Sequence, residues 1–168
     1  VLFLLNLFYV EFLQIFFYLF STKIVLIVNL FLIFYVFLTL FLVGLLWAGP
    51  MNLYDAVNHA FTAISTGGYS TKNASIAYWN SSYIEYVITI FMFIGATNMT
   101  LVYFCFNGNV KKLIKDEEFR WFFFFVLGAI IVVMVWILYL GFASDVENAF
   151  RKAAFQVVTL VSTCGFAT

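Results

Sequence analysis

Charged residues are scarce in this sequence: they make up 10% of its 168 residues, whereas 65% are hydrophobic and 23% are aromatic. A soluble domain has about 25% charged residues, so the composition argues against a water-soluble fold. Eight basic and eight acidic residues cancel to a formal net charge of zero, which leaves neither a nucleic-acid-binding footprint nor a polybasic patch for a membrane surface. The composition predicts a protein whose solvent is the lipid bilayer.

Cysteine and histidine are also scarce, with two cysteines, Cys105 and Cys164, and one histidine, His59. A structural zinc site takes about four ligands at short spacings, which these residues cannot supply. The two cysteines are expected near opposite membrane faces, about 30 Å apart, which is too far for a disulfide. A single histidine also argues against an intramembrane hydrolase, in which Ser65 or Ser70 would need His59 as its base.

The chain begins with an apolar run, residues 1–20, without an initiator Met, a basic region or a small-residue cleavage site. A secretory signal peptide has the last two features, so this run is not interpreted as one. Residues 1–23 are expected to form an apolar N-terminal helix outside the repeats described below. The chain is expected to begin and end within a longer protein.

Three later stretches are apolar over the length of about 20 residues that a membrane-spanning helix needs. They are residues 24–47, 83–106 and 119–142. The turn-forming pair Gly49-Pro50 ends the first stretch, and the polar Asn107-Gly108-Asn109 ends the second. The chain is therefore predicted to be an all-α membrane protein.

Basic residues predict the orientation of these spans. Four lie in or just after the loop 107–118: Lys111, Lys112, Lys115 and Arg120. The positive-inside rule places this loop in the cytoplasm, and counting back across two spans puts Lys23 on the same side. Lys72, Arg151 and Lys152 then lie outside.

Two segments, residues 52–71 and 147–168, are too short and too polar to cross the membrane. The first has helical spacing of its apolar residues before Gly67-Gly68 ends the pattern. A helix of about 13 residues rises roughly 20 Å, which reaches only partway through the hydrocarbon. Irregular backbone at that depth must be buried in protein or line a water-filled cavity. Two re-entrant pore helices beside a polar passage are predicted.

The two short segments are copies of one another at an offset of 97 residues. The offset aligns Thr62 with Thr159, Gly68 with Gly165, and the Ser-Thr pair that precedes each turn. An apolar span precedes each copy and another follows the first, so the repeating unit is helix, re-entrant segment, helix. This is the organisation of a pore-loop cation channel with two glycine-containing selectivity-filter loops.

The chemistry of a filter explains these residue types. A dehydrated monovalent cation is coordinated by a ring of backbone carbonyl oxygens, and glycine readily adopts the positive φ angles that aim them. The C-terminal end of the preceding helix adds partial negative charge. For one copy alone, an ordinary helix C-cap and turn is the alternative. The candidate ion-binding residues, through their carbonyls, are Thr66, Gly67, Gly68, Tyr69, Thr163, Cys164, Gly165 and Phe166.

Five segments carry a resemblance to a known family: Asp55-Ala-Val-Asn-His-Ala-Phe61, Ser65-Thr-Gly-Gly-Tyr-Ser-Thr71, Ala74-Ser-Ile76, Glu118-Phe-Arg120 and Ser162-Thr-Cys-Gly-Phe166. In this order they resemble the Trk/Ktr/HKT potassium transporter superfamily, and most of all its bacterial TrkH-type subunits, over residues 24–168. The resemblance implies four helix–pore–helix repeats around one pore. Residues 24–106 would be the second repeat, with Gly68 as its filter glycine, and residues 119–168 an incomplete third repeat with Gly165. The other repeats would lie outside this chain.

The resemblance further implies K+ transport across the inner (cytoplasmic) membrane by a multi-pass protein that is not an enzyme and needs no cofactor. Its implied partners are K+, membrane lipid, the remaining repeats and, in a homodimer, a cytosolic nucleotide-binding regulatory subunit; no nucleic acid is expected. The basic loop would contact that subunit, or would only determine topology. A sodium-permeable or Na+-coupled relative is the alternative, because in plant members a serine at a filter glycine is associated with sodium transport. A non-conducting subunit and a hydrolase are further alternatives.

Three other polar residues each have two interpretations. His59, one turn after Asp55, is either packed and hydrogen-bonded in the pore helix or a proton-sensing group. Asp55 either supports the first turn of that helix or attracts cations at the outer mouth. Asn98 lies inside the span 83–106, where it either bonds to a neighbouring helix or lines the pore.

Overall fold

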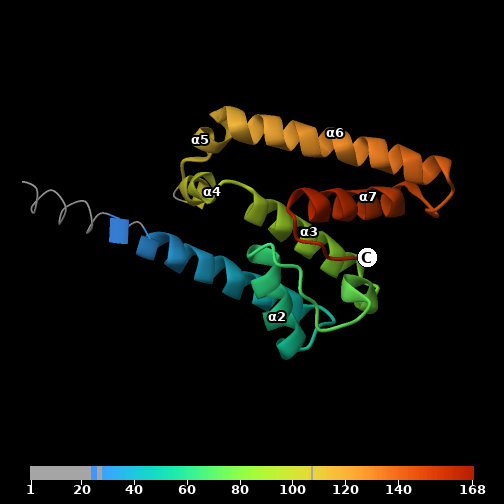
Figure 1. Cartoon of the computed structure of the whole chain (residues 1–168), viewed down its shortest axis with the longest axis horizontal. Coiled ribbons are helices and arrows are strands. Elements are labelled where there is room, and N and C mark those ends of the chain that lie inside the picture. Colours follow the sequence, from blue (N-terminus) through green and yellow to red (C-terminus); the bar gives the residue numbers. More distant parts are fainter. Residues whose placement is uncertain (1–23, 26–27, 107) are drawn as a thin grey trace, which may run out of the picture. The chain divides into compact units, whose positions relative to one another are not determined.

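A computed structural model of the chain (Figure 1) describes residues 24–25, 28–106 and 108–168. The N-terminal helix expected over residues 1–23 lies outside this part. Among the described residues the structure is helical or irregular, without a strand. The helices are Val28–Ala48, α2 Leu53–Ile64, η1 Ser75–Trp79, α3 Ser82–Ala96, α4 Met99–Phe106, α5 Val110–Lys115, α6 Glu117–Tyr139 and α7 Val146–Val161.

The chain divides into two compact units, Val1–Val36 and Phe37–Thr168. The described residues of the first unit are helical. The second unit contains both candidate filter loops and all the labelled helices.

Two of the described helices are long and apolar enough to cross a membrane, Val28–Ala48 and α6. They overlap the spans expected at residues 24–47 and 119–142. The outer face of α6 is apolar and exposed, as a surface in contact with lipid acyl chains would be: its most exposed side chains include Trp121, Phe125, Val132 and Tyr139. The fold is that of an all-helical membrane protein.

The expected span 83–106 is not one helix. It is divided into α3 and α4 at Thr97 and Asn98. The hydroxyl of Thr97 donates to the carbonyl of Phe93 at 2.8 Å, and the Oδ1 atom of Asn98 accepts from the backbone N–H of Thr100 at 3.0 Å. Thr and Asn compete in this way with backbone hydrogen bonds of a helix. Asn98 therefore lies just before α4 and caps its first turn, and it is exposed within the described structure.

Helix α7 packs against both α6 and α3, and α2 packs against α3 (Figure 1). Alanines at helical spacing line the buried faces of the two short helices, and they are completely inaccessible to solvent: Ala56, Ala60 and Ala63 in α2, and Ala149 and Ala153 in α7. Side chains this small allow close approach of neighbouring backbones. The close packing brings the C-terminal ends of α2 and α7 near one another.

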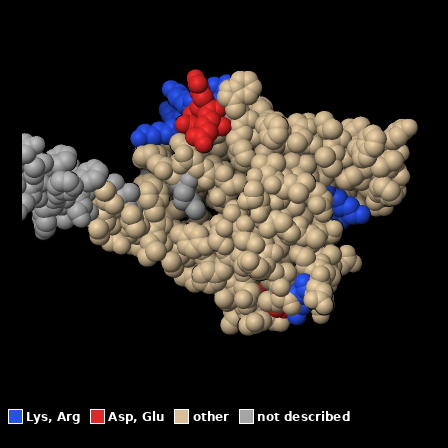
Figure 2. All heavy atoms as spheres, viewed as in Figure 1, with Lys and Arg blue, Asp and Glu red and all other residues tan. Residues whose placement is uncertain are grey.

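Most of the surface visible in Figure 2 is uncharged, and charged side chains gather at α5 and the start of α6. This group includes Lys111, Lys112 and Lys115 together with Asp116, Glu117 and Glu118. An uncharged surface of this extent fits lipid rather than water.

Candidate functional site

Helix α2 begins with a reciprocal side-chain cap. The Oδ1 atom of Asn52 accepts a hydrogen bond from the backbone N–H of Asp55 at 2.8 Å, and the Nδ2 atom of Asn52 donates to Oδ2 of Asp55 at 3.0 Å. The cap satisfies an N–H group that a helix start leaves free. It also holds the Asp55 carboxylate beside the loop that follows the helix.

Helices α2 and α7 end in the same irregular turn. The residues of the two turns that have positive φ angles are Thr66 (53°), Gly68 (64°), Thr163 (58°) and Gly165 (82°). The backbone hydrogen bonds also repeat: the N–H of Gly68 donates to the carbonyl of Thr62 at 3.2 Å, and the N–H of Gly165 donates to that of Thr159 at 3.2 Å. The duplication in the sequence is thus a duplication of backbone conformation.

A threonine hydroxyl holds each turn against its own helix. The hydroxyl of Thr62 lies 2.9 Å from the carbonyl oxygen of Tyr69 and 3.0 Å from that of Asn58, so these two acceptors share its one hydrogen. The hydroxyl of Thr159 donates to the carbonyl of Phe166 at 3.1 Å. Each bond joins the last turns of a helix to the residue that follows the loop glycine. The carbonyl oxygens of Tyr69 and Phe166 are therefore directed back toward the helices.

The other carbonyl groups of the two loops have no such partner. Among the described residues, no hydrogen-bond donor binds the carbonyl oxygens of Thr66, Gly67, Gly68, Thr163, Cys164 or Gly165. Gly67, Thr163 and Gly165 are exposed, Thr66 and Gly68 are half-buried, and Cys164 is buried with its carbonyl oxygen against Gly68. A carbonyl oxygen without a protein donor keeps its lone pairs for water or a cation.

The two loops touch at Gly68. A Cβ atom built on Gly68 would lie 1.7 Å from the carbonyl oxygen of Cys164 and 2.7 Å from its carbonyl carbon. No side chain fits at those distances, and the φ angle of Gly68 is unfavourable for any residue with a Cβ. Beside Gly165, no described atom lies within 4 Å of the corresponding Cβ position. The two glycines therefore lie in one shared region, but only Gly68 is crowded.

The Asp55 carboxylate ties the start of α2 to the chain beyond the first loop. Its Oδ1 atom accepts a hydrogen bond from the hydroxyl of Thr71, and its Oδ2 atom lies 3.3 Å from Nζ of Lys72. Burial alone would raise the pKa of Asp55, but the hydrogen bonds from Thr71 and Lys72 and the charge of Lys72 outweigh burial and hold this pKa below its ordinary value. The carboxylate therefore stays charged and paired.

The end of the second loop is held by residues of the second repeat, residues 24–106. The N–H groups of Ile76 and Ala77 donate to the carbonyl of Ala167 at 3.0 and 3.2 Å, and the N–H of Ala167 donates to the hydroxyl of Ser75 at 3.1 Å. Ser75, Ile76 and Ala77 form the start of η1, where helical N–H groups lack partners within the helix. Both loops therefore depend on residues of the second repeat.

A buried ion pair connects α3 to α7. The Nη1 atom of Arg151 lies 3.2 Å from Oε2 of Glu85, and the two side chains are 12% and 7% exposed. Next to this pair, the hydroxyl of Tyr86 donates to Oε1 of Glu147 at 2.9 Å. These contacts locate the second candidate pore helix on the second repeat.

The candidate filter residues differ in exposure although their backbones match. Tyr69 is 79% exposed, whereas Phe166, its counterpart, is 2% exposed. Cys164 is buried at 5% exposure. Both loops come together in the second unit, at the ends of α2 and α7.

Sequence reasoning overlooked two sets of site residues. The first set is Thr62 and Thr159, which bind loop carbonyls. The only sign of this shared role in the sequence is that both copies have threonine at the same position. The second set is Glu85 and Arg151. Glu85 lies inside an expected span, where an acidic residue normally has a partner, but the sequence indicates for Arg151 only a position outside the membrane.

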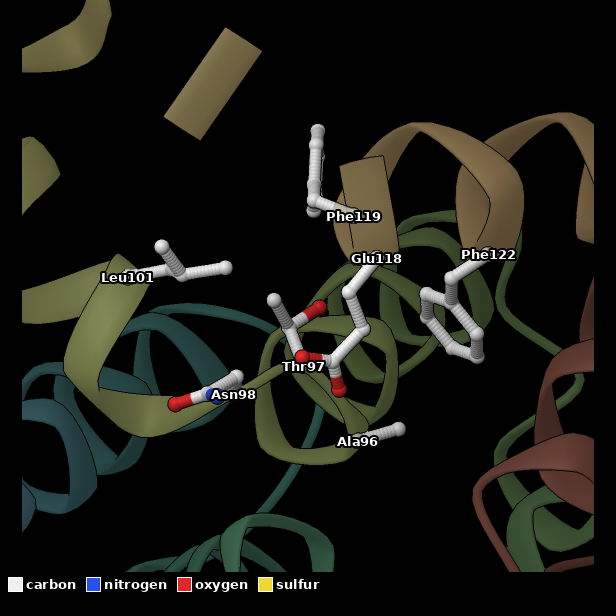
Figure 3. Close-up of a pocket in the computed structure, with 7 residues that line it drawn as sticks. All are labelled: Ala96, Thr97, Asn98, Leu101, Glu118, Phe119 and Phe122. Carbon is white, nitrogen blue, oxygen red and sulfur yellow. The ribbon is translucent and has the colours of Figure 1, made fainter. Parts of the chain in front are cut away.

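A small cavity of about 100 Å³ lies at the α3–α4 break, away from both loops. Figure 3 shows the side chain of Glu118, from the start of α6, extending toward Thr97. Asn98, Phe119 and Phe122 also line the cavity. None of the candidate filter residues lines it, so it is not part of the loop site.

The helices and duplicated loops define a helical membrane protein, and comparison with known proteins identifies its family. The sequence model of the TrkH family, described as a cation transport protein, matches residues 11–168. The chain belongs to this family. That family is one of transport proteins rather than enzymes.

Several characterised members are similar to the chain. The Trk system potassium uptake protein TrkH of Escherichia coli K12 is 36% identical over 137 residues, covering 80% of this chain and 28% of that protein. The TrkG protein of the same organism is 34% identical over 119 residues, covering 70% and 24%. The crystal structure of the potassium transporter TrkH from Vibrio parahaemolyticus superposes with a TM-score of 0.73 at 33% identity, over 77% of this chain and 28% of that one. The chain thus spans 28% of the length of TrkH from E. coli.

Proposed function

We propose that this chain carries part of the ion path of a potassium uptake protein in the inner (cytoplasmic) membrane, which the full-length protein crosses several times. The observation that carries the proposal is the contact between the two duplicated loops at Gly68 and Cys164. Relatives of the chain are named potassium uptake proteins. The proposed cargo is therefore K+, and no further cofactor is required.

In this proposal K+ passes between the loops while carbonyl oxygens replace its water shell. The C-terminal ends of α2 and α7 add partial negative charge beside the loops. The oxygens of Tyr69 and Phe166 each accept one bond from a threonine hydroxyl and keep a second lone pair for the ion. The proposed ligands are the carbonyls of Thr66, Gly67, Gly68, Tyr69, Thr163, Cys164, Gly165 and Phe166.

Two loops supply only part of a coordination shell, and the proposal places further loops of the full-length protein beside Gly165. Gly165 has the same left-handed backbone as Gly68, but no described atom lies near its Cβ position. The backbone of a third loop placed there would lie against Gly165 as the backbone of Cys164 lies against Gly68. The remaining repeats of the family's architecture are the proposed occupants.

The alternatives have less support. A sodium-permeable or Na+-coupled relative would share this architecture, but both filter positions hold glycine. A hydrolase would use the Ser70 hydroxyl, which lies 2.9 Å from His59, but His59 is fully buried and offers no access to a substrate carbonyl. A non-conducting subunit does not account for the repetition of the same glycine-containing turn in both copies.

The proposed protein partners bind at the cytoplasmic side. A homodimer with a cytosolic nucleotide-binding regulatory subunit is the proposed assembly, and the charged group at α5 is its proposed contact (Figure 2). Lys112 is held there, with Nζ 4.1 Å from the centre of the Phe104 ring. Topology determination is the competing explanation of these charges.

The test uses the full-length protein in cells that lack other potassium uptake systems, with Rb+ as tracer and Na+ as competitor. Gly68→Ser is expected to lower Rb+ uptake or Rb+/Na+ selectivity about tenfold, because left-handed backbone costs a residue with a Cβ roughly 1–2 kcal/mol and Cys164 must also move. Gly128→Ser is the matched control, since Gly128 lies in α6 with no atom within 4 Å of its Cβ position. Unchanged uptake and selectivity in Gly68→Ser would contradict the proposal.

A further inference from the structure

His59 lies behind the first loop and is completely buried, at 0% exposure. Its Nδ1 atom is 2.7 Å from the carbonyl oxygen of Asp55, one turn earlier in α2. A carbonyl oxygen can only accept a hydrogen bond, so Nδ1 carries a hydrogen. The ring orientation is thereby tied to the backbone of α2.

The second ring nitrogen faces the first loop. The Nε2 atom of His59 lies 2.9 Å from Oγ of Ser70, the residue after Tyr69. The same Oγ accepts the backbone N–H of Lys72 at 3.1 Å, which leaves the hydroxyl hydrogen free to point at Nε2. With Nδ1 protonated and Nε2 accepting, the imidazole is neutral, and it holds the chain directly beyond the loop.

The imidazole ring also contacts the second loop. Its centre lies 5.8 Å from that of the Phe166 ring, at an interplanar angle of 27°. Trp79 packs its ring at 5.0 Å and 83°, edge to face. Phe166 belongs to the second loop, and Trp79 ends η1, whose first residues bind Ala167. His59 therefore touches structure that supports both loops.

The second copy has no equivalent of this arrangement. The offset of 97 residues places Gln156 at the position of His59 and Ala167 at the position of Ser70. Alanine has no hydroxyl to donate, so the second loop lacks this bond. Its outer end is held instead by η1 and by the ring contact with His59. One side chain thus serves two loops.

From this geometry we infer that His59 is a positioning residue for ion selectivity, which keeps the two loops in register by bonding Ser70 and stacking on Phe166. This inference rests on the proposed function. A loop that is less firmly held adapts its carbonyl oxygens to a smaller ion, so loss of the bond admits Na+. His59 does not touch the ion in this role.

The test again uses the full-length protein and measures Rb+/Na+ selectivity together with the amount of protein in the membrane. His59→Phe retains an aromatic ring but no hydrogen bond, and Ser70→Ala removes the partner hydroxyl. Each is expected to lower selectivity about fivefold, the factor for about 1 kcal/mol, which is a typical net hydrogen bond. The double variant should lose less selectivity than the sum of the two single losses, because both single variants remove the bond between His59 and Ser70.

Two further variants serve as rescue and control. His59→Gln retains one donor and one acceptor and is expected to keep most of the selectivity. Asn58→Ala, at the neighbouring position of α2, removes an exposed bond to the carbonyl of Tyr54 and should leave selectivity unchanged.

The outcomes separate positioning from mere packing. Normal selectivity in Ser70→Ala, or additive losses in the double variant, would overturn the inference, and Ser70→Ala decides the question even if His59→Phe fails to fold. If Gly68→Ser loses selectivity while Ser70→Ala retains it, the proposed filter stands and the role of His59 falls. If Gly68→Ser has no effect, the filter itself is refuted.

Discussion

The ion pair between Glu85 and Arg151 is the contact through which a single substitution should most disturb the packing of the two repeats. The pair lies at the interface of α3 and α7, and its side chains are 7% and 12% exposed. A second carboxylate, that of Glu147, lies 3.4 Å from Nε of Arg151 and is 57% exposed. The arginine therefore has a buried and a partly solvated partner, whereas Glu85 has only Arg151 among the described ionic groups.

The expected magnitudes follow from this asymmetry. Arg151→Met leaves the Glu85 carboxylate buried without a counter-charge, and breaking a buried pair in this way costs about 3–5 kcal/mol. Glu85→Leu should cost less, because Glu147 still faces the arginine. The double variant replaces both charges by apolar groups, which is often close to neutral. It should be more stable than Arg151→Met alone.

The assay is thermal unfolding of the full-length protein purified in detergent. Tyr86→Phe is the matched control on the same helix, because it removes only an exposed hydrogen bond to Glu147, and such bonds contribute about 1 kcal/mol or less. The reasoning is refuted if Arg151→Met unfolds at the wild-type temperature. It is also refuted if the double variant loses as much stability as the two single variants together.

Two further predictions concern the loops. Thr62→Val and Thr159→Val each remove one hydroxyl that holds a loop carbonyl, so each should lower Rb+/Na+ selectivity about fivefold, for a bond of about 1 kcal/mol; a loss in only one of them would contradict the equivalence of the two turns. For Asp55, a folded pKa below the ordinary value means that its stabilisation is complete above the unfolded pKa of about 3.9 and is lost as the pH falls through the folded value. The difference in unfolding temperature between wild type and Asp55→Asn should therefore be full at pH 7 and shrink in acid, and a difference that grows in acid would show the sign to be wrong.

The helical fold and the duplicated turns could be predicted because both depend on local sequence. Long apolar runs predict helices in lipid whatever they pack against, and the family comparison and the described helices support this reading. The 97-residue offset predicted equivalent turns because positive φ angles depend chiefly on glycine and its neighbours. The structure adds that Thr66 and Thr163, which are not glycine, also adopt positive φ.

The division of the span 83–106 could not be predicted from hydrophobicity alone. Averaging over about 20 residues conceals a Thr-Asn pair, and such a pair breaks a helix only where its side chains bond to nearby backbone. Thr97 and Asn98 both do so here. Helix capping is therefore a third role of Asn98, besides packing and pore lining, and hydrophobicity does not indicate it.

Contacts between distant residues were equally hidden. Glu85 and Arg151 are 66 positions apart, and nothing in a single sequence pairs them. Gly68 contacts the backbone of Cys164, and no side chain in the sequence indicates a contact between backbone atoms. The sequence explains the glycine at position 68 by the positive φ angle of the turn. The close approach of the second loop is a separate reason for glycine there, and only the fold reveals it.

The two loops are best understood as one structural unit. On one face of α2, the residues Asp55, His59 and Thr62 follow helical spacing, and they bond in reverse order to the chain returning from the first loop. The second loop has only the threonine bond in common with this pattern, and it gains the rest of its support from η1 and His59. A change in residues 24–106 should therefore disturb the second loop more than a change in residues 119–168 disturbs the first loop. Selectivity, on this reasoning, depends on contacts between the repeats as much as on the loop residues themselves.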